Sequence, residues 1–560
     1  MNKIFLFIIA VLCMFSTDAF ASKAVTYSKK VTLQDGRETV VSLRGDENFS
    51  FWASSQGELI IREGDMWRVA TEQEIMAAEQ NFNNAMHKTG EGIHASHPFP
   101  HMGSPKALVI LVEFSDKSFF FEPDRIKNLF MGDTYDDSNG YHSYGSITQY
   151  FNDMSGGLYQ PQFDFAGPYT LPGTVAHYGN NEGGKDSNVY SFIKDACAAA
   201  DNDVDFSQYD ADGDGMVDLV FIMYAGYGEN WGASADCLWA KSGTGNYGTY
   251  DGVRVNRYGI NAEIAGSEEH FDPDGNPRLG GIGVIAHEFC HTIGLPDVYP
   301  TAKWDNVTDY DNQSMENWDL MDYGEYNYNG YFPTPLTAFE RELLGWIEIE
   351  TLDEPANVEL KPLQDGGKAY RIYNDNDEDC NEYYILEAIP NNWGTGWYTR
   401  MRGKGMLVTH INYDATLFSN FSNPNNEKGK PRWTVVPADG ILMSSYRKND
   451  SESEYYISTA TYNADHAGDT YPGTSNVTEL TEYPAYFGTV DKPITEITQD
   501  GYNISFKFMG GVDTGIEQNF NTSTDQSFNG AYNLAGQKVD DKYKGIIIKD
   551  GKKKVQNFCN

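Results

Sequence analysis

The sequence predicts an α+β protein of several units, in which a sheet covered by helices lies between two β-rich regions. The chain of 560 residues is longer than one ordinary domain. Residues 107–114 form an apolar run typical of a buried central strand, and helical patterns follow at 146–154 and 189–200. Residues 348–510 lack helical periodicity and show short strand-like runs between turns. These observations favour α+β over an all-α or all-β fold.

The composition is strongly acidic. There are 81 Asp and Glu against 41 Lys and Arg, which gives a net charge of −40. Such a charge repels phosphate backbones and anionic lipid surfaces, so nucleic acid is not expected as a partner. It favours solubility and the binding of cations.

The N-terminal residues 1–21 predict a secretory signal peptide. Lys3 precedes an apolar run at 4–15, and the small-residue pattern ending at Ala21 marks the expected cleavage site. The run is too short for a stable membrane span. We therefore expect a protein that is secreted to the extracellular space, the cell surface or the periplasm. The odd number of cysteines after residue 21 leaves at least one without an intramolecular disulfide: Cys197, Cys237, Cys290, Cys380 and Cys559.

Residues 22–103 predict a small β-rich unit followed by a linker. Strand-like runs alternate with glycine turns up to residue 69, and Thr71 and Glu74 form a capping box for a helix to about Met86. The linker that follows is rich in Gly, Pro and Ser.

An acidic loop in the next unit, residues 104–346, predicts a calcium site. Carboxylates at alternate positions around a glycine offer oxygen ligands to a hard cation, as in the first half of an EF-hand loop. Phe221 stands where an EF-hand has its last glutamate, so a complete EF-hand is excluded. The alternative is an acidic turn that leads into the strand at 219–224. The expected ligands are Asp210, Asp212, Asp214 and Asp218.

The stretch from residue 287 to residue 297 predicts a zinc site. His287 and His291 lie four residues apart, so a helix places both imidazoles on one face, with the carboxylate of Glu288 beside them. Gly294 ends the helix and allows the chain to turn Asp297 back toward the metal. Two imidazoles, one carboxylate and an open position form a catalytic rather than a structural site, with Glu288 as general base.

With these motifs the chain resembles the secreted metallopeptidases of the immune inhibitor A type, in the metzincin clan. The clan has a methionine turn under the zinc, and the resemblance implies that Met321 is its methionine and that Tyr323 stabilises the tetrahedral intermediate. It implies a metzincin-like catalytic domain at 104–346, with a twisted mixed sheet, a backing helix and an active-site helix. Cys290 departs from the pattern, and we interpret it as a buried thiol rather than a fourth ligand.

The same resemblance implies a role for the flanking regions. Residues 22–103 would be a prosegment that covers the cleft until it is cut, and because they contain no cysteine, a thiolate cannot be the blocking group. Residues 159–165 alternate in period two and contain a proline, which predicts an edge strand bordering the cleft. Residues 347–510 would be a β-sandwich. Residues 511–560 predict a linker and a small tail, similar to the C-terminal tails of secreted Bacteroidetes-type proteins, some of which are sorting signals.

Three functions compete. The first is a zinc endopeptidase acting on protein or peptide substrates, and we expect it to be monomeric. The second is a gluzincin-type zinc hydrolase in which Glu316 is the third ligand, although the glycine break after the second histidine argues against it. The third is a catalytically idle homologue that binds proteins or glycans through the β-sandwich.

Overall fold

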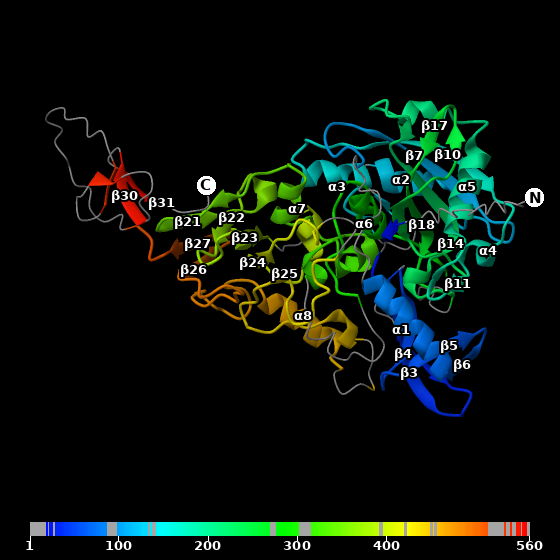
Figure 1. The fold of residues 1–560 in the computed structure, drawn as a ribbon, viewed down its shortest axis with the longest axis horizontal. Coiled ribbons are helices and arrows are strands. Elements are labelled where there is room, and N and C mark those ends of the chain that lie inside the picture. Colours follow the sequence, from blue (N-terminus) through cyan, green and yellow to red (C-terminus); the bar gives the residue numbers. More distant parts are fainter. Residues whose placement is uncertain are drawn as a thin grey trace, which may run out of the picture.

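The structure is a computed structural model (Figure 1), and it describes residues 18–20, 22–25, 28–46, 48–86, 98–132, 135–136, 142–268, 276–301, 315–390, 396–418, 423–448, 452, 456–512, 531–533, 538–539, 545–549 and 552–556. Most of the predicted signal peptide, much of the predicted linker and residues 513–530 lie outside this part of the chain. Within the described ranges, no helix combines the length and apolarity that crossing a bilayer requires.

The central sheet joins strands from distant parts of the chain. Among the described residues its order is β1-β15-β18-β14-β7-β10, with β19 paired to β18. Four of the strands run parallel, and β15 runs antiparallel to β18. The strands are β1 (Asp18–Phe20), β7 (Lys106–Glu113), β10 (Gln162–Thr170), β14 (Val220–Tyr227), β15 (Lys241–Thr244), β18 (Arg257–Ala265) and β19 (Arg278–Leu279).

Helices cover both faces of this sheet because successive side chains of a strand point to opposite sides. Leu108 and Ile110 of β7 pack in one core with α5, whereas Val109 and Leu111 pack in another with α2, α3 and α6. The predicted helices at 146–154 and 189–200 are confirmed as α3 and α5. The helices are α2 (Pro123–Met131), α3 (Ile147–Met154), α4 (Val175–Gly179), α5 (Val189–Ala200) and α6 (Gly283–Thr292).

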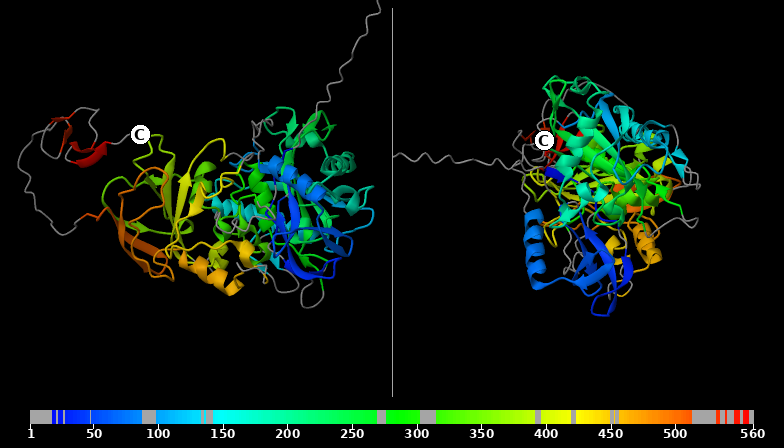
Figure 2. Two further views of the ribbon diagram at one scale, coloured as in Figure 1. Left: turned by 60° about the horizontal axis from the view of Figure 1, so that its bottom comes forward. Right: turned by 90° about the vertical axis from the view of Figure 1, so that its right-hand side faces the viewer.

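A second sheet precedes the central one in the chain and lies beside it with α1 (Figures 1 and 2). The predicted capping box is confirmed: the backbone N–H of Thr71 donates to Glu74 Oε2 at 2.7 Å, and that of Glu74 donates back to Thr71 Oγ1 at 3.4 Å. Trp239, from the region of the central sheet, is buried in the core of this second sheet. Its elements are β2 (Ser28–Thr32), β3 (Glu38–Gly45), β4 (Ser50–Ser54), β5 (Leu59–Glu63), β6 (Met66–Val69) and α1 (Glu72–Met86).

Two further sheets follow the central one and enclose a common core. One face of β23 and β24 packs in this core, and the opposite face joins the core around α6 and α7. No boundary between separate cores therefore divides α6 from the five-stranded sheet. The elements are α7 (Ala338–Leu343), β20 (Glu350–Thr351), β21 (Ala356–Leu360), β22 (Tyr370–Tyr373), β23 (Glu382–Ile389), β24 (Gly405–Asn412), β25 (Trp433–Val435), α8 (Thr459–Gly468), β26 (Ile494–Asp500) and β27 (Asn503–Phe508).

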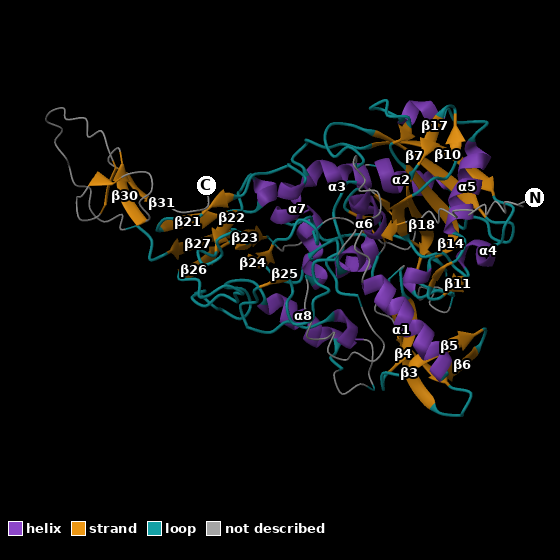
Figure 3. Cartoon of the chain, viewed as in Figure 1, coloured by secondary structure: helices purple, strands orange, loops and turns teal. Residues whose placement is uncertain are grey.

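Smaller strand pairs complete the described chain. Helices gather around α6, and strands dominate on both sides of them (Figure 3). The last four strands form a sheet of their own. The remaining strands are β8 (Tyr135–Asp136), β9 (His142–Ser143), β11 (Asn181–Glu182), β12 (Lys185–Asp186), β13 (Met216–Val217), β16 (Thr249–Tyr250), β17 (Val253–Val255), β28 (Ala531–Asn533), β29 (Lys538–Val539), β30 (Gly545–Lys549) and β31 (Lys552–Gln556).

Candidate metal centre

Helix α6 carries the central residues of the site and is buried along its whole length. It ends at Thr292, and Gly294 follows with a φ of 111°. A Cβ at Gly294 would meet nothing within 4 Å, so lack of room does not explain the glycine. The left-handed backbone conformation favours glycine at this position. As the sequence predicts, the turn at Gly294 carries the following residues back past the face of the helix.

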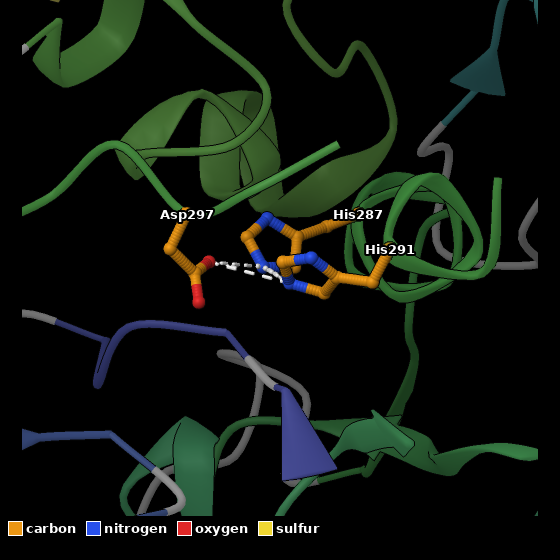
Figure 4. Close-up of side chains that lie close together, drawn as sticks. All are labelled: His287, His291 and Asp297. Atoms are coloured by element: carbon orange, nitrogen blue, oxygen red, sulfur yellow. Dashed lines mark hydrogen bonds and ion pairs between the residues drawn. The ribbon is translucent and has the colours of Figure 1, made fainter. Parts of the chain in front are cut away.

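The side chains of His287, His291 and Asp297 converge on one point (Figure 4). The two Nε2 atoms are 3.1 Å apart, and Asp297 Oδ1 lies 3.2 Å from His287 Nε2 and 3.3 Å from His291 Nε2. Both histidines are buried, and Asp297 is partly exposed.

This arrangement fits a small divalent cation. His287 Nδ1 lies 3.0 Å from the carbonyl oxygen of Leu320, and His291 Nδ1 lies 2.8 Å from that of Leu295. A carbonyl only accepts, so in neutral rings the proton sits on Nδ1 and both Nε2 atoms face the site as bare acceptors. Two bare nitrogens and a carboxylate repel one another unless a cation lies between them. Their separations approach the edge of a tetrahedron with bonds of about 2.0–2.1 Å, which is roughly 3.4 Å.

Glu288 is fully buried next to His287. Its Oε1 accepts a hydrogen bond from the backbone N–H of Ser22 at 2.9 Å, and its Oε2 has no hydrogen-bond partner among the described residues. Burial raises the pKa of Glu288 to about 8. The carboxylate is thus held beside His287 in a place where it readily takes up a proton.

A turn at residues 319–322 supports His287 and the residue after Asp297 through its backbone. The Leu320 carbonyl fixes the ring of His287, and the Met321 carbonyl accepts the N–H of Val298, next to Asp297, at 3.0 Å. Contacts of this kind orient metal ligands. Met321 is fully buried, and so is the free thiol of Cys290, whose pKa burial raises well above its usual range.

Tyr323 begins the 3-10 segment η5 (Tyr323–Gly330), two residues after Met321. Its ring is mostly buried and lies under the ammonium of Lys448, whose Nζ is 4.4 Å from the ring centroid.

Glu325 is a site residue that the sequence reasoning missed. It is fully buried, its Oε2 is 3.8 Å from His287 Nδ1, and neither carboxylate oxygen has a hydrogen-bond partner among the described residues. Burial raises the pKa of Glu325 well above its usual range. No motif marks this residue, because its approach to His287 depends on how η5 packs against α6.

The N-terminal segment lies in the site. Strand β1 pairs antiparallel with β15, with Phe20 opposite Ser242, and the chain then reaches Glu288 at Ser22. Ser22 and Lys23 are buried, and the Ser22 carbonyl accepts the indole N–H of Trp239 at 2.8 Å. The sequence carries no motif for these contacts, which join residues more than 200 positions apart.

Residues 162–165 lie in an edge strand, as the sequence predicts, but the expectation that this edge borders the cleft is wrong. β10 begins at Gln162 and runs parallel to β7 at one edge of the sheet, whereas β15 and β1 form the other edge. Helix α6 packs against β15 and β18. The alternation and the proline identified an edge strand, but they could not indicate which of the two edges adjoins α6.

Glu316 lies outside the histidine group, although the sequence left it open as a third ligand. It begins the 3-10 turn η4 (Glu316–Trp318) with a φ of 49°, a left-handed conformation that is uncommon for glutamate. Its Oε1 lies 3.6 Å from Lys23 Nζ.

The acidic loop brings together Asp210, Asp212 and Asp214. Backbone N–H groups of the loop donate to their carboxylates, for instance that of Gly215 to Asp210 Oδ2 at 3.0 Å. Asp218 lies outside this group, and its side chain accepts the N–H of Ala211 at 3.0 Å.

The part of the chain that holds this site is similar to known proteins. Residues 100–347 match the family described as immune inhibitor A peptidase M6, catalytic domain. The chain is 27% identical over 302 residues to the pre-pro-metalloprotease PrtV of Vibrio cholerae serotype O1. This alignment covers 46% of this chain and 32% of that protein. The chain is also 28% identical over 301 residues to immune inhibitor A of Bacillus thuringiensis subsp. alesti. This second alignment covers 44% of this chain and 41% of that protein.

The matched segments therefore span well under half the length of these two relatives. The family match includes α6, the turn at 319–322 and the acidic loop. Residues 100–347 are therefore similar to the catalytic domain of the immune inhibitor A peptidase M6 family.

Proposed function

We propose that the chain is a secreted, zinc-dependent endopeptidase that hydrolyses internal peptide bonds of extracellular proteins. The convergence of His287, His291 and Asp297 next to Glu288 is the observation that supports this most strongly. Two imidazoles and one carboxylate, with one direction left open, are typical ligands of a catalytic zinc ion. The names of the relatives, a metalloprotease and an immune inhibitor, support the same reaction class.

In this proposal the metal ion and the protein side chains have different roles in hydrolysis. His287, His291 and Asp297 would hold a zinc ion, which would supply Lewis acidity for the attacking water and the substrate carbonyl. Glu288 takes the proton of that water and passes it to the leaving nitrogen, a general-base and then general-acid role. Tyr323 is proposed to donate a hydrogen bond to the oxygen that becomes negative, as the metzincin resemblance implies.

We also propose that the chain is made as a precursor, with residues 1–21 as signal peptide and 22–103 as prosegment. The contact of the Ser22 N–H with Glu288 supports this, because it engages the general base and fills the space next to the metal ligands. The segment contains no cysteine, so steric blocking together with backbone contacts maintains latency. The relative PrtV is named a pre-pro-metalloprotease.

The proposal is tested with Glu288→Gln. The amide preserves the size of the side chain but cannot take up a proton. We expect the processed variant to keep about one zinc per chain and to lose about 10²- to 10⁴-fold in the rate of casein hydrolysis. Zinc is measured by atomic absorption, and hydrolysis by release of labelled peptides.

Glu359→Gln, a change of the same kind at an exposed position on β21, serves as the matched control and should keep the parental rate. If processed Glu288→Gln hydrolyses casein as fast as the parent, the proposed mechanism is wrong.

A further inference from the structure

Lys23 is buried in a closed pocket of acidic and aromatic groups. Only 1% of its side chain is exposed, although lysine is rarely buried without a partner. Its Nζ lies 3.1 Å from Asp322 Oδ1 and 3.6 Å from Glu316 Oε1, and 4.5 Å from the ring centroid of Tyr446. Nζ also donates to Ser445 Oγ at 3.4 Å.

The walls of this pocket come from two parts of the chain. Glu316 precedes the turn at 319–322, and Asp322 is the last residue of that turn. Ser445 and Tyr446 belong to η8 (Ser445–Lys448), which follows the five-stranded sheet in the chain. The pocket exists only where the region after residue 347 packs against the peptidase domain.

Contacts other than those with Lys23 hold both carboxylates in place. Glu316 Oε2 accepts the backbone N–H of Ser445 at 3.0 Å and the hydroxyl of Tyr462 at 3.1 Å. Asp322 Oδ2 accepts the backbone N–H groups of Met315 and Glu316 at 3.2 and 2.7 Å. The two acidic groups therefore remain in place after Lys23 has left.

When Lys23 leaves, two buried carboxylates lose their cationic partner. A buried charge without a partner raises the free energy of the protein. Lys448 is another cation near the pocket, but its Nζ lies over the rings of Tyr323 and Tyr462, at 4.4 and 4.2 Å from their centroids. It forms no ion pair within 4.0 Å with a carboxylate of the described residues. A new cationic side chain entering the pocket restores the lost pairing.

The N-terminal segment also indicates which substrate position faces this pocket. In the proposed mechanism Glu288 protonates the leaving nitrogen, and the nitrogen of Ser22 is the one that contacts Glu288, at 2.9 Å. Ser22 therefore occupies the place of the first residue after the scissile bond, and Lys23 that of the second.

We propose that the enzyme prefers substrates with lysine or arginine at the second residue after the scissile bond, bound by Glu316 and Asp322 in a pocket that the C-terminal region completes. The inference rests on the proposed function. It deepens that function by naming a substrate class and a region of the chain that determines specificity.

Peptide substrates provide the test. Four quenched fluorescent peptides carry Lys, Arg, Leu or Glu at the second position after one scissile bond and are otherwise identical. For the processed enzyme we expect kcat/KM to be about 10- to 100-fold higher with Lys or Arg than with Leu, and lowest with Glu, as is typical of a buried charge-assisted contact. Equal kcat/KM for Lys and Leu would overturn the inference and leave the proposed peptidase activity untouched.

The variant Glu316→Gln tests whether the pocket causes the preference for lysine or arginine. The ratio of kcat/KM between the Lys and Leu peptides should fall toward one in this variant, because one of the two carboxylates is neutralised. The matched control Glu359→Gln should keep the parental ratio. A parental ratio in a folded Glu316→Gln enzyme would place the preference elsewhere and overturn the assignment.

Binding without turnover separates this inference from the proposed function. The tetrapeptide Ser-Lys-Ala-Val repeats residues 22–25, and Ser-Leu-Ala-Val is its matched control. Calorimetry with the processed enzyme should give about tenfold or more tighter binding for the lysine peptide, even if no peptide is cleaved. Equal affinities for the two tetrapeptides would overturn the proposed specificity pocket. Tighter binding of the lysine peptide without any hydrolysis would contradict only the peptidase function.

Discussion

At the scale of single residues, Asp297 completes the group that the two histidines begin. Its Oδ1 lies 3.2 and 3.3 Å from their Nε2 atoms. We expect Asp297→Ala to lower zinc affinity by more than the 10- to 100-fold typical of losing a residue that merely supports a ligand. Competition with a zinc-binding dye measures this affinity.

Glu316→Ala is the informative companion variant, because the sequence alone left Glu316 open as the third ligand. Its carboxylate pairs with Lys23 and lies outside the histidine group, so zinc affinity should stay close to the parental value. Zinc lost with Glu316→Ala and retained with Asp297→Ala would reverse the proposed ligand set.

Much of this site could be predicted from sequence because its geometry is local. A four-residue spacing on a helix and a glycine at its end place His287, His291 and Asp297 within eleven residues. Glu325 could not be predicted in this way, because it reaches His287 only through the packing of η5 on α6.

At the scale of elements, the contact of α7 with β23 contains a buried carboxylate. Glu387 Oε1 accepts the backbone N–H of Ala338 at 3.3 Å, and burial raises the pKa of Glu387 from 4.5 to about 7. The folded state therefore holds this proton to higher pH than the unfolded chain does. Its stabilising effect is complete below about pH 4.5 and is lost as the pH rises through about 7.

We expect Glu387→Gln to reduce the loss of stability between pH 5 and pH 8, because the amide cannot ionise. At about 1.4 kcal/mol per pKa unit, the difference from the parent is at most roughly 3 kcal/mol. Urea unfolding at the two pH values measures it, with Glu359→Gln as control. An identical pH dependence in parent and Glu387→Gln would show that this carboxylate does not carry the effect.

The acidic loop before β14 is the second element for which we make a prediction. Three converging carboxylates and the left-handed turn at Gly213 suit calcium, which we propose to be structural. Because a ligand that binds only the folded state stabilises it, about 1 mM calcium should raise the melting temperature of the zinc-loaded protein.

Asp212→Ala should abolish this response to calcium and leave zinc content unchanged. If calcium leaves the melting temperature of the parent unaltered, or raises that of Asp212→Ala equally, the loop is only an acidic turn. Differential scanning calorimetry distinguishes the two cases.

At the scale of the whole molecule, the N-terminal segment connects the peptidase domain with the region after it. The Lys23 ammonium contacts Asp322 on one side and Ser445 on the other. We expect Lys23→Glu in the full chain to raise peptidase activity before processing by at least about tenfold, because a carboxylate is repelled by Glu316 and Asp322.

Lys23→Arg keeps the positive charge and should leave the unprocessed chain latent, which makes it the matched control. Casein hydrolysis by freshly purified, uncut protein is the measurement. An uncut Lys23→Glu chain as inactive as the parent would show that this contact is not needed for latency.

These long-range contacts were also the least accessible to sequence reasoning. The acidic composition, the strand-rich flanks and the helices around the central sheet follow from local patterns. The hydrogen bond between Ser22 and Glu288 joins residues 266 positions apart, and sequence periodicity cannot predict a contact of such separation. For the same reason the sequence indicated an edge strand but not the edge that adjoins α6.

The position of Lys23 also determines when latency can arise during synthesis. Lys23 leaves the ribosome early, but Asp322 and Ser445 follow only 299 and 422 residues later. At about 5–20 residues per second, the last of these partners appears roughly 20–80 s after Lys23. The histidines of α6 are translated within that interval, before the pocket is complete. In the proposed precursor, latency would therefore be acquired late, together with the packing of the C-terminal region. A chain that ends before Ser445 would contain His287, His291 and Asp297 without a complete binding site for Lys23.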